Sequence, residues 1–188
     1  MRKIVHFVHT SLDGFIEGPN GEFDWPVMSG ELSAFSLDLA GEADAFLYGR
    51  TVWDMMSSYW PDVESISDDE HDLAHAPVWR KKPKVVFSRT LEKADWNTRV
   101  IGANLAEEVV ALKAEPGGDM ILMGGSALPG VLAEAGLIDE YQVVVHPVVL
   151  GGGKPLLGHP ARRIGLDLVE SRVFDGRTTL LRYRPKSV

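Results

Sequence analysis

One stretch of nine residues limits the fold more than any other part of this sequence. Residues 119–127 read Asp-Met-Ile-Leu-Met-Gly-Gly-Ser-Ala, a short apolar run followed by two glycines and then by helix-forming residues. This order predicts a strand, a glycine turn and a helix. Such a turn suits an anion, because glycine leaves room for a ligand beside the backbone and the first helical amides have no partner within the helix. The same turn would also serve as a tight connection with nothing bound, and it matches neither Gly-x-Gly-x-x-Gly nor the Walker pattern.

The rest of the chain alternates between apolar runs and helix-like segments. Expected strands cover residues 3–9, 43–48, 84–87, 97–101, 119–123 and 141–145, and expected helices cover 30–40, 105–113 and the residues after 51 and 127. An Asp-Gly pair between the β-rich runs 166–174 and 178–183 predicts a hairpin. This pattern indicates an α/β fold with a mostly parallel sheet and an antiparallel C-terminal hairpin.

Two segments are expected to lie outside this pattern. Residues 10–30 contain Pro-Asn-Gly and predict a long loop with a short hairpin in it, and the loop keeps large aromatic side chains. Residues 58–82 are polar and acidic and predict a surface excursion.

Composition excludes several classes of function. A chain of 188 residues fits one domain, expected to span 1–188. The net charge of −8, without a basic stripe, argues against nucleic acid and anionic membranes as partners. No apolar run reaches the length of a membrane span and the chain has no cysteine, so a cytoplasmic location is expected. His71 and His75 have a spacing that could bind a metal on a helix, but their acidic neighbours predict a solvated face, and no metal is expected.

Three successive strand ends carry residues that suit anions. They are Gly49-Arg50-Thr51, Ser88-Arg89-Thr90 and Gly124-Gly125-Ser126-Ala127. In parallel sheets ligands bind outside the carboxyl ends of the strands, so these segments are expected to lie at the same edge. Each has an ordinary structural interpretation alone, but together they fit a ligand with several separated phosphates, such as a dinucleotide.

The ordered set of motifs resembles a known family. The three strand ends, with Ser11-Leu12-Asp13-Gly14-Phe15-Ile16 before them and His146-Pro147-Val148-Val149-Leu150-Gly151 after them, look like the dihydrofolate reductase-like superfamily. More closely, they are similar to the branch that contains the reductase domain of riboflavin biosynthesis. The resemblance covers nearly the whole chain and implies a three-layer α/β fold that binds NADPH.

The resemblance assigns cofactor roles residue by residue. Gly124, Gly125, Ser126 and Ala127 match the pyrophosphate turn, and the residues Gly49, Arg50 and Thr51 match the segment at the phosphates. Ser88 and Arg89 match the pocket for the adenosine 2′-phosphate. Arginine presents a fork of donors that fits phosphate oxygens, so these residues favour NADPH over NADH.

Three residues are candidates on the substrate side. Asp13 and Trp25 match the mobile loop over the nicotinamide and the substrate, although an Asp beside a glycine is also a common turn residue. Dihydrofolate reductases carry a carboxylate on the first helix, a position that falls near Ser33 here. Glu31 is the nearby acid and the third candidate, although a first-turn acid also suits the helix dipole. Dihydrofolate is therefore not the expected substrate.

We expect a stand-alone NADPH-dependent reductase that transfers hydride to a C=N or C=O of a small molecule that the sequence does not identify. One alternative is reduction of the riboflavin precursor 5-amino-6-(5-phosphoribosylamino)uracil. A second alternative, from a different class, is a nucleotide-binding protein without turnover.

The sequence also predicts a homodimer through residues 141–157. This segment is apolar and has no helix after it, so Val143, Val145, Val148 and Leu150 are expected to be partly uncovered. The related riboflavin reductases pair through this region. The competing interpretation is that the C-terminal hairpin covers these residues within one chain.

Overall fold

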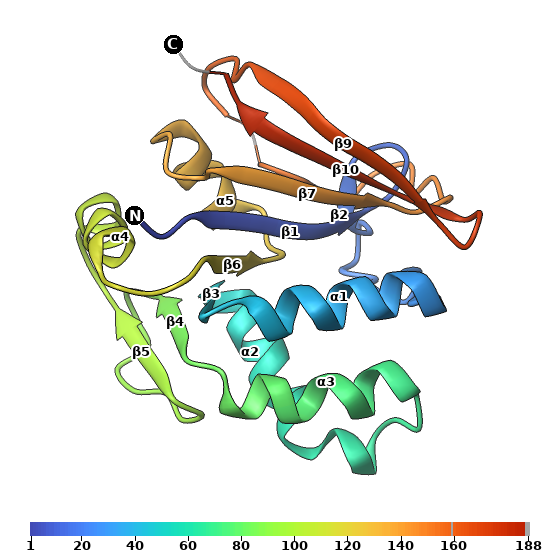
Figure 1. Ribbon diagram of the computed structural model, residues 1–188, viewed down its shortest axis with the longest axis horizontal. Coiled ribbons are helices and arrows are strands. Elements are labelled where there is room, and N and C mark those ends of the chain that lie inside the picture. Colours follow the sequence, from blue (N-terminus) through green and yellow to red (C-terminus); the bar gives the residue numbers. More distant parts are fainter. Residues whose placement is uncertain (159, 187–188) are drawn as a thin grey trace.

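The computed structural model describes residues 1–158 and 160–186, and its centre is an eight-stranded sheet (Figure 1). The strand order is β5-β4-β3-β6-β1-β7-β10-β9. The strands are β1 (Ile4–Thr10), β3 (Ala45–Gly49), β4 (Lys84–Phe87), β5 (Thr98–Ile101), β6 (Met120–Met123), β7 (Glu140–Val145), β9 (Leu166–Phe174) and β10 (Thr178–Pro185). Neighbouring strands run parallel through β5, β4, β3, β6, β1 and β7. Strand β10 pairs antiparallel with β7, and β9 pairs antiparallel with β10. The expected α/β fold with an antiparallel C-terminal hairpin is therefore confirmed.

Helices cover both faces of the sheet. The first three are α1 (Gly30–Glu42), α2 (Arg50–Tyr59) and α3 (Glu70–Lys81), and they lie together on one side of the sheet in Figure 1. The other face packs against α4 (Leu105–Ala114) and α5 (Ala127–Glu134). Side chains alternate along each strand, so that Phe46 joins the core under α1 and Leu47 joins the core on the opposite face. No helix in the ranges that the structure describes has the length and apolar character needed to cross a membrane.

The interpretation of residues 58–82 as a surface excursion is wrong. A short 3-10 helix (Trp60–Ser65) and α3 occupy this segment and complete the helical layer. The carboxylate of Asp69 accepts a 2.9 Å hydrogen bond from the amide of His71 and so caps α3. The fully buried Trp79 donates from Nε1 to the hydroxyl of Tyr48 at 3.0 Å. The acidic residues that suggested a solvated segment instead supply the cap and the first turn of this helix.

The long loop after β1 does not form a hairpin with itself. Its strand β2 (Phe15–Glu17) pairs with β8 (Lys154–Pro155), which lies more than a hundred residues later. The amide of Leu12 also donates to the carbonyl of Val148 at 2.8 Å. These bonds fasten the loop to the segment that follows β7, at the carboxyl ends of the central strands.

Candidate functional site

The predicted anion-binding segments lie at one edge of the sheet. Because β4, β3 and β6 are neighbours and run parallel, their carboxyl ends bring Ser88, Gly49 and Gly124 to the same edge in that order. The next strands are β1 and β7, whose carboxyl ends carry His9 and His146. A ligand bound along this edge from β4 to β7 therefore contacts the three predicted anion-binding segments at one end and the two histidines at the other.

The amino ends of α2 and α5 converge in the middle of this edge. A Cβ built on Gly49 would lie 3.4 Å from Cβ of Leu128 in α5, and a Cβ on Gly125 would lie 3.4 Å from Cγ2 of Val52 in α2. No side chain caps the first amides of either helix within the described residues. Two uncapped helix ends side by side form a strong anion site, because their free amides and their dipoles act on the same space.

The glycine turn leaves room for a ligand. Gly124 and Gly125 have φ values of 53° and 76°, which side-chain-bearing residues rarely adopt. No atom of the described residues lies within 4 Å of a Cβ built on Gly124, so this position opens to solvent. The turn and the two helix ends fit a pyrophosphate. Ala127 begins α5, and the hydroxyl of the buried Ser126 donates to the carbonyl of Pro155, so this hydroxyl is engaged within the chain.

Arg50 and Thr51 occupy the first turn of α2. Nε of Arg50 donates to both carboxylate oxygens of Asp54, at 2.8 and 2.7 Å, one helical turn further on. Both side chains are largely exposed, so this ion pair contributes little to stability. Arg50 can therefore leave Asp54 and bind a phosphate instead with little loss of free energy.

Ser88 and Arg89 follow β4 at the same edge. The buried Oγ of Ser88 accepts hydrogen bonds from the amides of Thr90 and Leu91, at 3.3 and 3.1 Å, and so holds the turn closed. Arg89 is exposed beside it. Because β4 lies beside β3, this turn follows the strand next to the one that leads into α2, and its arginine is of the residue type that binds a phosphate.

Two histidines to which the sequence interpretation gave no role in the site meet at the other end of the edge. Nδ1 of His9 lies 2.8 Å from Nε2 of His146, and the Trp25 ring stands edge-on to His146 with the ring centroids 5.5 Å apart. Burial lowers the pKa of His9 to about 3, assisted by the nearby His146 and His71. Burial also lowers the pKa of His146 to about 4, assisted by Arg177. Both imidazoles are therefore neutral at pH 7.

A carboxylate is absent from the matching position of the first helix. Ser33 stands there, and its Oγ lies 2.8 Å from Nδ1 of His71 on α3. His71 is also near enough to His9 to help lower its pKa, so β1, the end of β7 and α3 each bring a histidine toward this end of the edge. A search for histidines at strand ends would have found His9 and His146, but only the β1–β7 pairing shows that they meet.

The two acidic candidates are both engaged with backbone amides. The carboxylate of Asp13 accepts from Leu150 and Gly151, at 3.1 and 2.8 Å, and a hydrogen bond from Ser11 holds the pKa of Asp13 below its usual range. The carboxylate of Glu31 accepts a hydrogen bond from the backbone amide of Asp175 at 2.7 Å. The backbone amide of Glu31 in turn donates to the carboxylate of Asp175 at 3.0 Å. Asp13 thus fastens the loop and Glu31 fastens α1 to the β9–β10 turn, and the catalytic roles of both stay predictions.

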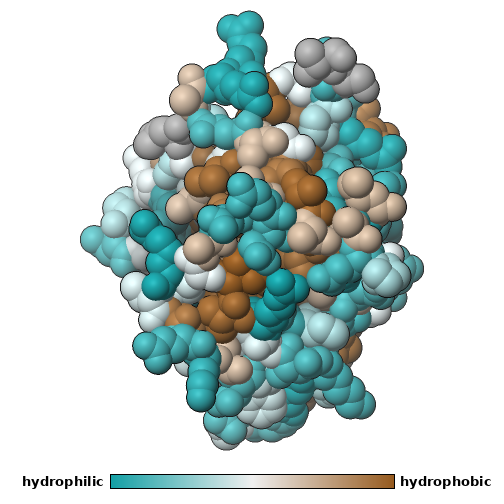
Figure 2. Space-filling model, turned by 90° about the vertical axis from the view of Figure 1, so that its left-hand side faces the viewer, coloured by the Kyte–Doolittle hydropathy of each residue, from teal (hydrophilic) through white to brown (hydrophobic). Residues whose placement is uncertain are grey.

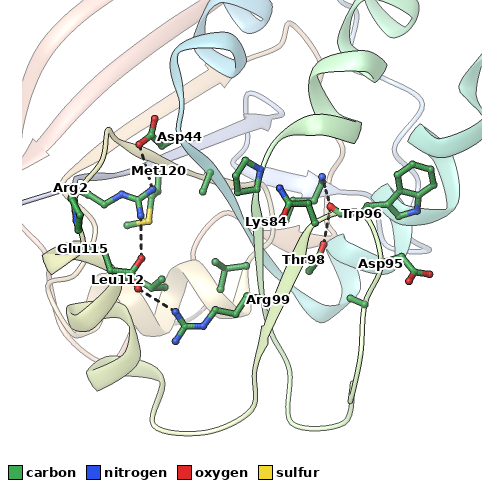
Figure 3. Close-up of a pocket in the computed structure, with 16 residues that line it drawn as sticks. Arg2, Asp44, Lys84, Asp95, Trp96, Thr98, Arg99, Leu112, Glu115 and Met120 are labelled. Atoms are coloured by element: carbon green, nitrogen blue, oxygen red, sulfur yellow. Dashed lines mark hydrogen bonds and ion pairs between the residues drawn. The ribbon is translucent and has the colours of Figure 1, made fainter.

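A cavity lies at the opposite edge of the sheet, at the amino ends of the strands. It has a volume of about 840 Å³ and is lined by the amino ends of β3, β4, β5 and β6 (Figure 3). Figure 2 faces this edge and shows apolar residues at its centre with polar residues across them. Several of its charged groups already have partners, since Arg2 pairs with Glu115 at 3.6 Å and Nζ of Lys84 donates to the Trp96 carbonyl at 2.9 Å. These contacts give the cavity a structural explanation. Within residues 1–158 and 160–186, no three His, Cys, Asp or Glu side chains are grouped so as to hold a metal ion.

Comparison with known proteins agrees with this geometry. Residues 2–180 match the family described as the RibD C-terminal domain. The chain is 39% identical over 185 residues to the uncharacterized protein YyaP of Bacillus subtilis (strain 168), a match that covers 97% of this chain and 94% of YyaP. A candidate riboflavin biosynthesis protein from Shewanella sp. PV-4 has a TM-score of 0.76 and 26% identity, with 100% of both chains covered. Dihydrofolate reductase from Enterococcus faecalis, complexed with NADP(H) and RAB-propyl, has a TM-score of 0.66 and 14% identity, with 98% of this chain and 97% of that chain covered.

The chain therefore belongs to the RibD C-terminal domain family, and its fold is that of the dihydrofolate reductase-like reductases. The resemblance expected from the sequence motifs is confirmed.

Proposed function

We propose that this chain is an NADPH-dependent reductase that acts on a C=N or C=O of a small heterocyclic or carbonyl substrate. The observation that carries the proposal is the pair of uncapped helix ends, α2 and α5, which meet beside the glycine turn at the carboxyl edge. When bound, the dinucleotide would supply the hydride. The protein would bind the dinucleotide, orient it and exclude water around the reacting carbon.

The residues along the edge divide this work by position. The amides at the starts of α2 and α5, with Gly124 and Gly125, would hold the pyrophosphate. Ser88 and the exposed Arg89 would hold the 2′-phosphate, with Arg50 between the two phosphate sites. The opposite end of the dinucleotide would then reach the carboxyl ends of β1 and β7. The Enterococcus dihydrofolate reductase, which shares this fold, was solved with NADP(H).

Calorimetric titration with NADPH and with NADH tests the proposal. A guanidinium at the 2′-phosphate predicts that NADPH binds at least about 10-fold more tightly, because a hydrogen bond to a charged group contributes about 1.5–3 kcal/mol. Steady oxidation of NADPH, followed at 340 nm with a panel of cyclic ketones and imines, tests turnover. NADPH binding without turnover of any member would favour a nucleotide-binding protein instead, and equal affinity for both dinucleotides would remove the role of Arg89.

Family membership favours one specific alternative substrate. The RibD family match and the likeness to the Shewanella protein support reduction of 5-amino-6-(5-phosphoribosylamino)uracil, the riboflavin precursor. Turnover of this compound at rates well above those of simple cyclic ketones would establish that alternative. A reductase of this kind is expected to act in the cytoplasm, where NADPH is available.

We also propose a homodimer through residues 141–157. Of the four residues expected to be partly uncovered, Val145, Val148 and Leu150 are partly exposed, whereas Val143 lies in the core and is only 8% exposed. Val149 in the same segment is 64% exposed, and Val173 on the edge strand β9 is 59% exposed. These apolar side chains support an interface on this side of the molecule.

A further inference from the structure

The histidine pair occupies the place where the reaction would occur. His9 lies on β1, which is hydrogen-bonded to β6 on one side and to β7 on the other. The amide of Gly124 donates to the carbonyl of Phe7 at 2.9 Å, so the glycine turn lies beside the last residues of β1. A dinucleotide whose phosphates lie at the glycine turn would therefore extend its reactive end toward His9.

The contact between the two rings requires a shared proton. Nδ1 of His9 and Nε2 of His146 are 2.8 Å apart, which is hydrogen-bond distance, and one nitrogen must donate to the other. If His146 is the donor, Nε2 of His9 carries a proton that is free to be donated elsewhere. Neither Nε2 of His9 nor Nδ1 of His146 has a hydrogen-bond partner among the described residues. The pair thus has a donor at one end and an acceptor at the other.

Burial decides which ring faces a substrate. His146 is only 2% exposed, with the Trp25 ring against it, whereas His9 is half-buried. By exposed area, His9 is therefore the member that a substrate can reach and His146 lies behind it, although the atoms packed around the His9 ring lower its pKa more than that of His146.

The groups around the pair keep it uncharged. His71 faces His9 from α3, and Arg177 faces His146 from the β9–β10 turn. Asp13 and Glu31, the nearby acids from the loop and α1, are engaged with amides of Leu150, Gly151 and Asp175. A neutral imidazole can still polarise a carbonyl and donate its proton to it.

We propose that His9 is the proton donor to the substrate of the reductase and that His146 resupplies it, in place of the carboxylate used on the first helix by dihydrofolate reductases. The inference rests on the proposed function. Hydride from a dihydronicotinamide would reduce the carbon of a C=O or neutral C=N bond, and the oxygen or nitrogen would take the Nε2 proton of His9. As that proton leaves, Nδ1 of His9 would take the proton from Nε2 of His146, and Nδ1 of His146 would take one from water, so that both rings stay neutral. After the product leaves, water would reprotonate Nε2 of His9, its Nδ1 proton would return to Nε2 of His146, and Nδ1 of His146 would release its proton to water, which restores the starting pair. The products are the alcohol or amine and the oxidised nicotinamide, so the substrate class is an uncharged carbonyl or imine.

Two probes that differ only in their need for a proton test this step. Isatin, a neutral cyclic ketone, needs hydride and a proton, whereas the N-methyl-3,4-dihydroisoquinolinium cation needs hydride alone. In the full chain with NADPH, His9→Asn and His146→Asn should each lower isatin reduction by about 100-fold or more, the usual scale of general acid catalysis. Reduction of the iminium and NADPH affinity should change less than about 3-fold. His75→Gln is the matched control, since it removes a buried histidine that packs between Trp60 and Phe46 and leaves the pair intact, and it should change neither reaction.

A second readout does not depend on turnover. In the histidine-15N-labelled wild-type protein saturated with NADP+, the NMR signals of His9 and His146 should report neutral rings from pH 6 to 8. Isatin should shift those signals and leave His75 unchanged.

Each other result counts against the inference. Equal losses with both probes would show a structural role, and unchanged isatin reduction would show that the proton comes from elsewhere. Reduction of the iminium but not of isatin by the wild type, or histidine signals that isatin does not shift, would also contradict it. In those cases the proposed function stands. A wild-type protein that binds NADPH and reduces neither probe, or that does not bind NADPH, would contradict the proposed function itself and this inference with it.

Discussion

Mild acid should destabilise this protein through its buried histidines. Burial lowers the pKa of His6 and His75 to about 4, from 6.5, and the values for His9 and His146 are about 3 and 4. Between pH 6.5 and pH 4 the unfolded chain therefore binds more protons than the folded chain, so stability falls as the pH falls through this range and the loss levels off below the folded pKa.

The size of this effect follows from the pKa values. A histidine that titrates near 6.5 when unfolded and near 4 when folded loses about 2 kcal/mol of stabilisation between pH 7 and pH 5. The four groups together would remove several kcal/mol, which is a large part of the whole stability of about 5–15 kcal/mol of a typical domain. Carboxylates with lowered pKa values, such as Glu64 at about 2, lose their contribution only at lower pH, so the window from pH 7 to pH 5 belongs to the histidines.

Urea unfolding at pH 7 and pH 5, followed by tryptophan fluorescence, measures the loss. His75→Gln is the matched control, because it removes one titrating group that lies in the core between Trp60 and Phe46. Whatever its own stability, this variant should lose about 2 kcal/mol less than the wild type over the same pH change. Equal wild-type stability at both pH values would contradict the lowered pKa values, since the histidines would then titrate alike in the folded and unfolded chains.

Four further changes test the site and the assembly. Arg89→Ala should reduce the preference for NADPH over NADH by roughly 1–3 kcal/mol in calorimetric titration and leave NADH affinity unchanged; loss of both affinities would argue against a 2′-phosphate site. Gly124→Ala should lower the free energy of unfolding in urea by about 1–2 kcal/mol, because the φ of 53° at this position is unfavourable for alanine. The variant should also bind NADPH more weakly, because the added methyl group enters the open space beside the helix amides. Dihydrofolate should be reduced slowly or not at all and methotrexate should bind weakly; efficient turnover that Glu31→Gln abolishes would contradict this. Light scattering at micromolar concentration should give a molecular mass of about twice 20.7 kDa. Leu150→Arg should lower the measured mass toward that of the monomer, and a monomeric wild-type protein would exclude the dimer.

The parallel sheet and the phosphate-type edge could be predicted from local patterns. Each strand end is a short apolar run followed by glycine or by a hydroxyl with an arginine, and the edge rule for parallel sheets places these ends together without knowledge of the strand order. The C-terminal hairpin followed from Asp175 and Gly176, whose φ values of 50° and 63° are those of an Asp-Gly turn.

The substrate side depended on contacts that no local pattern contains. His9 and His146 are 137 residues apart and meet only because β7 pairs with β1. Glu31 has a first-turn helix position that the pattern shows, but its bond to Asp175 spans 144 residues. Helix α3 was missed because its acidic residues mark its start, while Trp79, which fixes it to the core, stands among lysines and an arginine.

A crystal structure of the full chain with NADP+ is the most direct test of the proposed cofactor site. We expect the pyrophosphate at the amino ends of α2 and α5 beside Gly124, the 2′-phosphate at Ser88 and Arg89, and the nicotinamide next to His9. A dinucleotide bound instead in the cavity at the amino ends of the strands, against Arg2 and Lys84, would contradict this expectation.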